Sequence, residues 1–432
     1  MSLLDVLTKY RKDPSLAAGP ASLLPDAEAL DRSDPLRHKR DEFLLPAQSV
    51  YLDGNSLGPM PVAARQRAQA VLDQQWGEDL ICSWNKHSWI DLPQTVGDKI
   101  APMLGAAPGQ VICCDSVSIN LFKVLSAALG LNPGRRKIVS QRDNFPTDLY
   151  VVQGLQQLLG ETQCELEVLP EEEIEGALDD QVAVLLLTQV NFRSGYAHDI
   201  ARLTRAAQAH GALVIWDLAH STGVMPLELD HWNVDFAVGC GYKYLNGGPG
   251  APAFVYAARR HHAALRQPVA GWMGHQSPFE FSPEYTPAGD IRQFLAGTPP
   301  ILSMSVLDAA LDVYRDVDIR QVKQKALNLA DYFAARMMEL PSLQSLELAT
   351  PLAHIERGAQ LAYVHPQAFA ICQCLIAEGV IADFRAPNIL RFGFSPLYLS
   401  FCGLDKALER FAAIMEKKLY ALPEFNVRKK VT

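Results

Sequence analysis

The sequence predicts an α/β fold with a large domain on a mostly parallel sheet and a smaller α/β domain after it. Between about residues 100 and 260, apolar runs of strand length alternate with segments of helical period. Strands that are apolar throughout are typical of a sheet covered by helices on both faces. After Pro299-Pro300 the pattern changes to long helices and then to a shorter αβ unit. A chain of 432 residues with 49% hydrophobic content can bury the cores of two domains.

The large domain is predicted to contain six strands, at 111–115, 137–141, 182–190, 212–218, 235–241 and 251–257. A helix follows the first strand and carries one apolar face, formed by Leu121, Leu125, Ala128 and Leu129. The amphipathic segment 200–211 reads as a second helix, closed by Gly211.

The second domain is predicted to begin with long helices over roughly 302–340. A strand at 361–366, a helix at 368–380, a strand at 389–396 and a terminal helix at 404–421 follow. We expect about the first 55 residues to pack on this domain. The expected divisions are an N-terminal segment at 1–60, a large domain at 61–310 and a small domain at 311–432.

Composition argues against several classes of partner. The net charge is −9, and the only dense basic run is short, at 428–430, so neither nucleic acid nor an anionic membrane is an expected partner. No uncharged apolar stretch is long enough to span a bilayer, and the N-terminus lacks an apolar signal core. The eight cysteines show neither a disulfide framework nor metal-ligand spacing, which favours buried thiols in a reducing cytoplasm and no bound metal.

Asp217 and Lys243 are the most informative pair in the chain. Asp217 ends the apolar run ALVIW, and Lys243 follows the apolar run VDFAV. Ligands of α/β proteins bind at the carboxyl ends of the strands. An acid and a lysine placed there suit pyridoxal 5'-phosphate (PLP), because the amine forms a Schiff base and the carboxylate keeps the ring nitrogen protonated. The alternative is a salt bridge at the sheet edge.

Other polar and aromatic residues fall at the same predicted edge. Ser116-Val117-Ser118 stands where a strand meets a helix, which makes either a phosphate cradle or a simple N-cap. Phe145, within the segment 144–148, follows a strand and could stack on a cofactor ring or pack in the core. Thr188 ends another strand, and Tyr242 beside Lys243 has either a functional or a structural role.

The chain resembles kynureninases, which are PLP-dependent enzymes of fold type I in the aminotransferase superfamily. The motifs that carry the resemblance run in order along nearly the whole chain: YLDGNSLG (51–58), SVSINL, NFPTD, DLAH, GYKYLNGGPG, GWMGH (271–275), TPPIL (298–302) and RFGFSPLY (391–398). DLAH alone indicates only the superfamily. GYKYLN, GWMGH and RFGFSPLY together indicate the one family.

The resemblance implies a role for each matched position. Lys243 is implied to be the Schiff-base lysine, Asp217 to face the pyridine nitrogen with support from Asp148, and Tyr242 to move protons. The implied cofactor-binding set also contains Val117, Ser118, Phe145, Pro146, Thr147, Thr188, His220, Trp272 and Thr298. Of these, Trp272 and Thr298 are implied to reach the site from the partner subunit of a homodimer. Arg391 is implied to bind the substrate α-carboxylate, with Asn55 and Ser56 at the rim.

The implied reaction is hydrolysis of L-kynurenine, a small molecule, to anthranilate and L-alanine in tryptophan catabolism. Thr298 stands where animal members of the family have Asn, and the region around Cys82 lacks their His. We therefore expect kynurenine to be preferred over 3-hydroxykynurenine. The alternatives are a cysteine desulfurase or class V aminotransferase on the same fold, and an inactive scaffold protein.

Overall fold

The computed structural model describes residues 1–19 and 22–427, so the basic run at 428–430 lies outside the described residues. The chain divides into two compact units. The larger unit holds residues 63–192 and 197–314, and the smaller unit holds 1–62, 193–196 and 315–432. Among the described residues, no helix combines the length and the apolar composition that crossing a bilayer requires.

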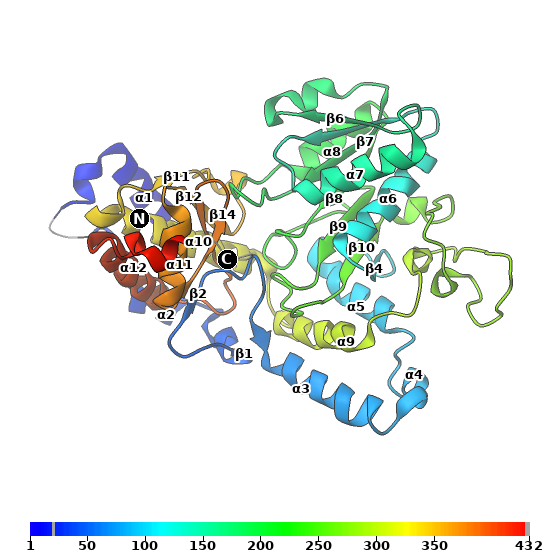
Figure 1. Ribbon diagram of the computed structural model, residues 1–432, viewed down its shortest axis with the longest axis horizontal. Coiled ribbons are helices and arrows are strands. Elements are labelled where there is room, and N and C mark those ends of the chain that lie inside the picture. Colours follow the sequence, from blue (N-terminus) through cyan, green and yellow to red (C-terminus); the bar gives the residue numbers. More distant parts are fainter. Residues whose placement is uncertain (20–21, 428–432) are drawn as a thin grey trace. The chain divides into compact units, whose positions relative to one another are not determined.

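A seven-stranded sheet forms the centre of the larger unit (Figure 1). Its strands lie in the order β4, β10, β9, β8, β7, β5, β6. The strands are β4 (Val111–Cys113), β5 (Lys137–Gln141), β6 (Glu165–Leu169), β7 (Val182–Thr188), β8 (Leu213–Asp217), β9 (Phe236–Cys240) and β10 (Ala253–Ala257). Only β10 runs antiparallel to its neighbours. The predicted α/β fold with a mostly parallel sheet is confirmed.

Every residue of the central strands β7, β9 and β10 is buried. Such strands need helices over both faces of the sheet. The unit supplies α3 (Val62–Ala70), α4 (Ser83–Lys86), α5 (Leu92–Ile100), α6 (Val117–Leu131), α7 (Pro146–Leu159), α8 (Ile200–Ala209) and α9 (Ile301–Ala310). The core under α6 and α7 joins Leu121, Val124 and Val152 to Val184 and Val238 of the sheet.

The sequence analysis missed β6 at the edge of this sheet. Its five residues ELEVL alternate charged and apolar side chains, and all five are half-buried. An edge strand pairs on one side only, so it needs no continuous apolar run. The helices predicted over roughly 302–340 are present: α9 ends at Ala310, and the next long helix begins at Ile319.

The smaller unit is built on a four-stranded antiparallel sheet in the order β11, β12, β15, β14. These strands are β11 (Glu347–Leu348), β12 (Gln360–Val364), β14 (Asp383–Arg385) and β15 (Ile389–Gly393). Short pairs join β1 (Phe43–Leu44) to β3 (Met60–Pro61) and β2 (Val50–Tyr51) to β13 (Val380–Ile381). The helices are α1 (Leu3–Lys12), α2 (Ala27–Ser33), α10 (Ile319–Glu339), α11 (Ala368–Ala377) and α12 (Phe401–Glu416).

Hydrogen bonds to α10 and to the start of α12 hold the N-terminal segment in the smaller unit. Tyr10 of α1 donates to the Glu339 carboxylate of α10 at 2.6 Å, and Tyr10 itself is fully buried. The backbone N–H groups of Phe401 and Cys402 donate to the Asp31 carboxylate of α2. Asp31 therefore neutralises part of the positive end of the α12 dipole.

Candidate active site

The carboxyl-terminal edge of the large sheet gathers a set of buried polar side chains. Asp217 is the last residue of β8, and its main chain is fixed between two neighbours: Gln189 N donates to Asp217 O at 3.0 Å, and Leu218 N donates to Val238 O at 2.8 Å. Asp217 is only 3% exposed. Its Oδ1 atom accepts from the Ala219 N–H at 2.7 Å. Burial raises the pKa of Asp217, and the nearby Lys243 ammonium opposes that rise.

Asp148 lies at the same edge of the sheet, in the first turn of α7. It is fully buried, its Oδ2 atom lies 3.1 Å from Thr188 Oγ1, and its Oδ1 atom has no hydrogen-bond partner. Burial, with the neighbouring Asp217 carboxylate, raises the pKa of Asp148 well above its usual range. The two carboxyl groups are thus coupled, and like charges so deeply buried disfavour double ionisation.

Thr188 and Asn144 connect this acid pair to the strands behind it. Thr188 Oγ1 also contacts Asn144 Oδ1, and Asn144 Nδ2 donates to Ser140 Oγ at 3.1 Å. A hydroxyl has one proton, so Thr188 can donate to Asn144 or to Asp148 but not to both. A proton held on Asp148 resolves this conflict by donating to Thr188 instead. Asn144 was not among the predicted site residues, although it belongs to the segment that was singled out.

Lys243 lies in the loop that follows β9. Its Nζ atom is 3.0 Å from Nε2 of His220 and 5.9 Å from the centre of the Tyr242 ring. Burial raises the pKa of the Tyr242 phenol far above its usual value, so Tyr242 is neutral at ordinary pH. The structure therefore brings together five predicted residues from three strand ends and a helix start: Asp148, Thr188, Asp217, His220 and Lys243.

Two glycines allow the lysine loop its tight path. A Cβ on Gly241 would lie 2.5 Å from Pro252 O, and a Cβ on Gly247 would lie 2.7 Å from Gly241 O. Both distances are shorter than real carbon contacts, so neither position admits a side chain without movement of the backbone. Tyr314 supports the same loop, because its hydroxyl donates to Tyr244 O at 2.6 Å.

The start of α6 provides an anion-binding element in the same unit. Ser116 is the N-cap, and its hydroxyl accepts from the Ile119 N–H. Val117 and Ser118 occupy the first turn and are half-buried. The first N–H groups of a helix have no partner within the helix, and the helix dipole makes this end positive. Both properties favour a phosphate group.

The remaining predicted residues of the larger unit have different surroundings. Phe145 is 40% exposed and meets the Phe192 ring edge-on at 5.2 Å, so it is not a core phenylalanine. Pro146 and Thr147 open α7. Trp272 packs on the core and against Phe279, whereas Thr298 is exposed. The Phe279 ring and the core residues that Trp272 contacts do not belong to the lysine cluster.

Arg391, Asn55 and Ser56 lie in the smaller unit, where they form a second polar cluster. Arg391 is 1% exposed and pairs its Nε atom with Asp383 Oδ1 at 2.9 Å. Its Nη2 atom donates to Ser56 Oγ at 2.8 Å. Asn55 is fully buried and donates to Gln360 Oε1 at 3.1 Å. Gly393 makes room for Asn55, since a Cβ there would lie 2.0 Å from Asn55 Oδ1.

Sequence reasoning missed Asp383 and Asp53 in this second cluster. Asp53 stands inside the motif YLDGNSLG, which offered a signal that was not used. Asp383 offered none, because it lies in the short strand β14, which the sequence pattern did not reveal.

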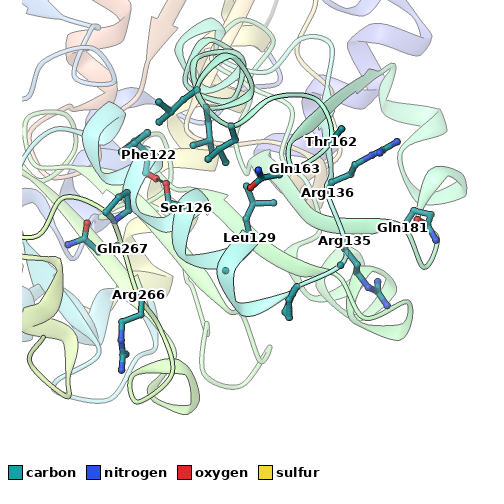
Figure 2. Close-up of a pocket in the computed structure, with 17 residues that line it drawn as sticks. Phe122, Ser126, Leu129, Arg135, Arg136, Thr162, Gln163, Gln181, Arg266 and Gln267 are labelled. Atoms are coloured by element: carbon teal, nitrogen blue, oxygen red, sulfur yellow. Dashed lines mark hydrogen bonds between the residues drawn. The ribbon is translucent and has the colours of Figure 1, made fainter. Parts of the chain in front are cut away.

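A groove of about 780 Å³ lies elsewhere on the larger unit, between α6, α7 and the loop at 266–268 (Figure 2). It is lined by none of the predicted site residues. Its arginines are already engaged: Arg135 donates to the carbonyls of Val182 and His210, and Arg136 pairs with Glu165. The groove is therefore separate from the candidate active site.

The residues of the larger unit fit PLP. Asp217 and Asp148 form a buried acid pair beside one nearby cation, Lys243, so a protonated ring nitrogen would supply a second positive charge. The helix start at Ser116–Ser118 suits a phosphate group, and the exposed face of Phe145 suits a flat ring. The unpartnered Oδ1 atom of Asp148 is the observation that points most directly to a missing polar group.

Comparison with known proteins gives consistent results over the sequence and the fold. The family model described as "Kynureninase C-terminal domain" matches residues 322–411. Kynureninase from Burkholderia pseudomallei (strain 1106a) is 48% identical over 412 residues, covering 94% of this chain and 99% of that protein. Kynureninase from Deinococcus radiodurans is 49% identical over 403 residues, covering 92% and 98%.

Two solved structures share the fold at low sequence identity. A mutant C-DES with glycine covalently linked to its PLP cofactor matches with a TM-score of 0.73 at 16% identity, covering 86% of this chain and 98% of that chain. The cysteine desulfurase CsdA from Escherichia coli matches with a TM-score of 0.72 at 19% identity, covering 88% and 98%. The expected fold type I architecture is confirmed.

Proposed function

The chain belongs to the kynureninase family, and from this premise we propose that it is a PLP-dependent hydrolase that converts L-kynurenine to anthranilate and L-alanine. The observation that carries the proposal is the position of the half-buried Lys243 beside the buried Asp217 and Asp148 at the carboxyl edge of the sheet. The near full-length likeness to kynureninases supports the choice of substrate. The reaction belongs to tryptophan catabolism, and we extend the proposal to a role in NAD biosynthesis.

PLP, when bound, takes up electrons released from the substrate carbon skeleton. In the proposed mechanism Lys243 carries the cofactor and then, once released, takes the proton from the substrate Cα. Its Nζ atom lies beside His220 Nε2, which gives the displaced amine a hydrogen-bond partner. Asp217 keeps a positive charge on the ring nitrogen, because its carboxylate is buried and close to few other cations.

The proposal gives each remaining group one task. Asp148 and Thr188 hold Asp217 and the ring, Phe145 stacks on the ring, and Pro146 and Thr147 fix the turn that carries Phe145. Val117 and Ser118 hold the phosphate. Tyr242 is neutral because burial raises the pKa of its phenol, so it can donate a proton during cleavage of the Cβ–Cγ bond. Arg391 binds the substrate α-carboxylate, with Asn55 and Ser56 beside it.

The two cysteines of α11 weigh against a desulfurase, which needs an exposed, nucleophilic thiol in a loop well after the lysine. Cys372 and Cys374 are fully buried in α11, and burial raises the pKa of both thiols. The inactive-scaffold alternative is not favoured either, since Lys243, Asp217 and Arg391 are all present.

We extend the proposal to a cytoplasmic homodimer. All eight cysteines are free thiols, which suits a reducing compartment. Near Trp272 the larger unit exposes Phe279 and Phe281, at 64% and 75% of their surface. Apolar exposure of this kind is typical of a face that a partner covers. The dimer can be tested by mixing Lys243→Ala protein with Trp272→Ala protein, so that hybrid dimers form. If the hybrids retain as much cofactor as the mean of the two parent proteins, the result would contradict a cofactor site shared between subunits.

The experiment that tests the proposed function is incubation of purified holo-protein with L-kynurenine. We expect anthranilate fluorescence and L-alanine to appear in equal amounts. Sulfide release from cysteine, or amino transfer to a keto acid without anthranilate, would favour the other enzymes of this fold. No product from any of these substrates would favour the scaffold.

We expect kynurenine to be preferred over 3-hydroxykynurenine by roughly tenfold in kcat/KM. The extra hydroxyl of 3-hydroxykynurenine would lose its hydrogen bonds to water on binding, and a pocket without a partner for it would give none in return. Thr298 is exposed, and Cys82 is exposed at the end of a short 3₁₀ turn. Thr298→Asn should reduce the preference. A wild-type preference for the hydroxylated substrate would show that other residues form the aryl pocket.

A further inference from the structure

Arg391 is held in place by a fully buried carboxylate. Asp383 contacts both the Nε and the Nη2 atoms of the guanidinium, and it is itself 1% exposed. Ser56 donates its hydroxyl proton to Asp383 Oδ2 at 2.8 Å and accepts from Arg391 Nη2 at the same distance. This two-point contact fixes the plane of the guanidinium and thereby the direction in which its remaining N–H groups point.

Two further charged residues complete the cluster. Arg385, on the same strand as Asp383, donates from Nη2 to Asp383 Oδ2 at 2.8 Å. Asp53, from the loop after β2, accepts the Ser56 N–H at its carbonyl oxygen at 2.9 Å, and its Oδ1 atom is buried with no hydrogen-bond partner. The cluster thus contains two guanidinium groups and two carboxyl groups, and only one of the carboxyl groups, Asp383, is fully engaged by the arginines.

We propose that Asp53 is a protonated carboxyl group that sets the affinity of this cluster for the substrate α-carboxylate, with Asp383 as the positioning residue of Arg391. This inference rests on the proposed role of Arg391. With Asp53 neutral, two arginines and one ionised aspartate leave one net positive charge for the incoming anion. Ionisation of Asp53 removes that charge and places a second anion beside the substrate carboxylate.

The surroundings of Asp53 favour its neutral form. Burial and the Asp383 carboxylate raise the pKa of Asp53 to about 7, against the opposing effect of Arg391. The other titratable groups around it are Arg385, Tyr51 and Cys372. Burial raises the pKa of the Tyr51 phenol and of the Cys372 thiol, and the Asp53 carboxylate raises both further, so these two groups stay neutral while Asp53 titrates.

The test is the pH dependence of carboxylate binding in wild type and Asp53→Asn. L-Alanine carries the α-carboxylate without the aryl group, and its binding to holo-protein can be followed by the change in cofactor absorbance. We expect the wild-type Kd for L-alanine, and the KM for kynurenine, to rise roughly tenfold more between pH 6 and 8.5 than in Asp53→Asn. At pH 6 the two proteins should bind equally well.

Titration of the amino group of alanine or kynurenine affects both proteins equally, so only the difference between their profiles reports on Asp53. Asp405→Asn is a matched control, because Asp405 pairs with Tyr332 and Arg336 in a separate cluster of the same unit. It should keep the wild-type profile. Asp383→Asn should raise KM at every pH and lower kcat much less, as expected for a positioning residue.

Identical pH profiles in wild type and Asp53→Asn would overturn the inference, and so would an equal loss of affinity at every pH in the variant. These outcomes are distinct from failure of the proposed function, in which the wild-type protein forms no anthranilate at any pH.

Discussion

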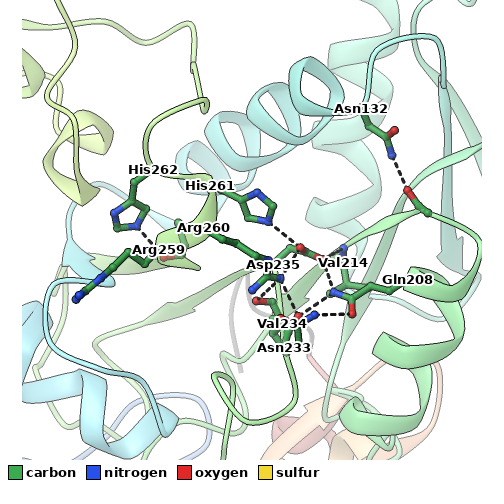
Figure 3. Close-up of polar contacts among 12 residues, drawn as sticks. Asn132, Gln208, Val214, Asn233, Val234, Asp235, Arg259, Arg260, His261 and His262 are labelled. Carbon is green, nitrogen blue, oxygen red and sulfur yellow. Dashed lines mark hydrogen bonds and ion pairs between the residues drawn. The ribbon is translucent and has the colours of Figure 1, made fainter.

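Asp217 and Asp235 are equally buried carboxylates at opposite edges of the same sheet, and their surroundings differ sharply. Asp217 ends β8, whereas Asp235 directly precedes β9. Asp235 accepts from four donors: the Val214 N–H, Gln208, Arg260 and His261 (Figure 3). Among the described residues, the side chain of Asp217 accepts a hydrogen bond from the Ala219 N–H alone. Hydrogen bonds from His261 and Gln208 outweigh burial and lower the pKa of Asp235, whereas burial raises that of Asp217.

The difference separates a carboxylate that joins elements of the fold from one whose surroundings suit the binding of a ligand. The donors of Asp235 come from α8, β8 and the turn at Arg259–His261, so the carboxylate joins three elements at the amino edge of the sheet. Asp217 joins no elements through its side chain in this way. A buried charge short of donors is costly to the fold, and such sites are frequent where proteins bind ligands.

The largest expected effect is at the carboxyl-terminal edge of the large sheet, which holds Lys243 and Asp217. Lys243→Ala should lower turnover of kynurenine by roughly 10⁴-fold or more, because no other amine among the described residues lies beside Asp217 and His220. The measurement is anthranilate formation by protein reconstituted with excess PLP. Lys406→Ala, an exposed lysine of α12, is the control and should keep wild-type activity. Substantial turnover by Lys243→Ala would contradict the assignment of Lys243 as the lysine that carries PLP.

Asp217→Asn should leave PLP bound and lower turnover by about 10³-fold, because a neutral amide cannot hold the ring nitrogen protonated. Its stability without cofactor should change little, since the side chain bridges no elements. The measurements are the visible absorbance of the bound cofactor, the turnover number and the urea midpoint. Wild-type turnover in this variant would show that Asp217 does not face the cofactor ring.

Asp235→Asn should give the opposite result: loss of about 3 kcal/mol of unfolding free energy, with turnover per folded molecule within about twofold of wild type. Because the folded pKa of Asp235 is lowered, its contribution is present above the unfolded pKa and is lost as pH falls through the folded pKa. The stability gap between wild type and variant should therefore begin to narrow below about pH 4 and close only once the pH is below the folded pKa of Asp235. A gap that persists there would mean that the charge is not the cause.

The smallest expected effect concerns Asp148 in protein without cofactor. Its pKa is raised, so its ionisation destabilises the fold, and wild-type stability should fall as pH rises from the unfolded pKa through the folded pKa. Asp148→Asn lacks this loss and should be more stable than wild type by about 1 kcal/mol at pH 8. Urea unfolding at pH 5 and pH 8 measures the difference. A variant less stable than wild type at pH 8 would place Asp148 with Asp235 among the carboxylates that serve the fold.

The residues at the carboxyl-terminal edge of the large sheet could be predicted from the sequence because they directly follow apolar strands. Asp217 and Thr188 end strands that the apolar pattern revealed, and parallel strands bring their carboxyl ends to one edge. The cluster around Arg391 could not be assembled in this way. Ser56 meets Asp383 across 327 positions of sequence, and β14 is too short to show a pattern. Two of the four donors of Asp235, Arg260 and His261, were equally hidden, because turn residues carry no periodic signal.

Borohydride reduction of the holo-protein, followed by peptide mapping, tests the central claim most directly. Reduction makes the bond between the cofactor and its lysine permanent, so the modified peptide identifies the residue that carries PLP. We predict a single cofactor-derived label, on Lys243, and none in protein first stripped of cofactor. A label on another lysine, or no label in protein that contains stoichiometric PLP, would contradict the assignment of the active site to the edge formed by Asp217, Asp148 and Lys243.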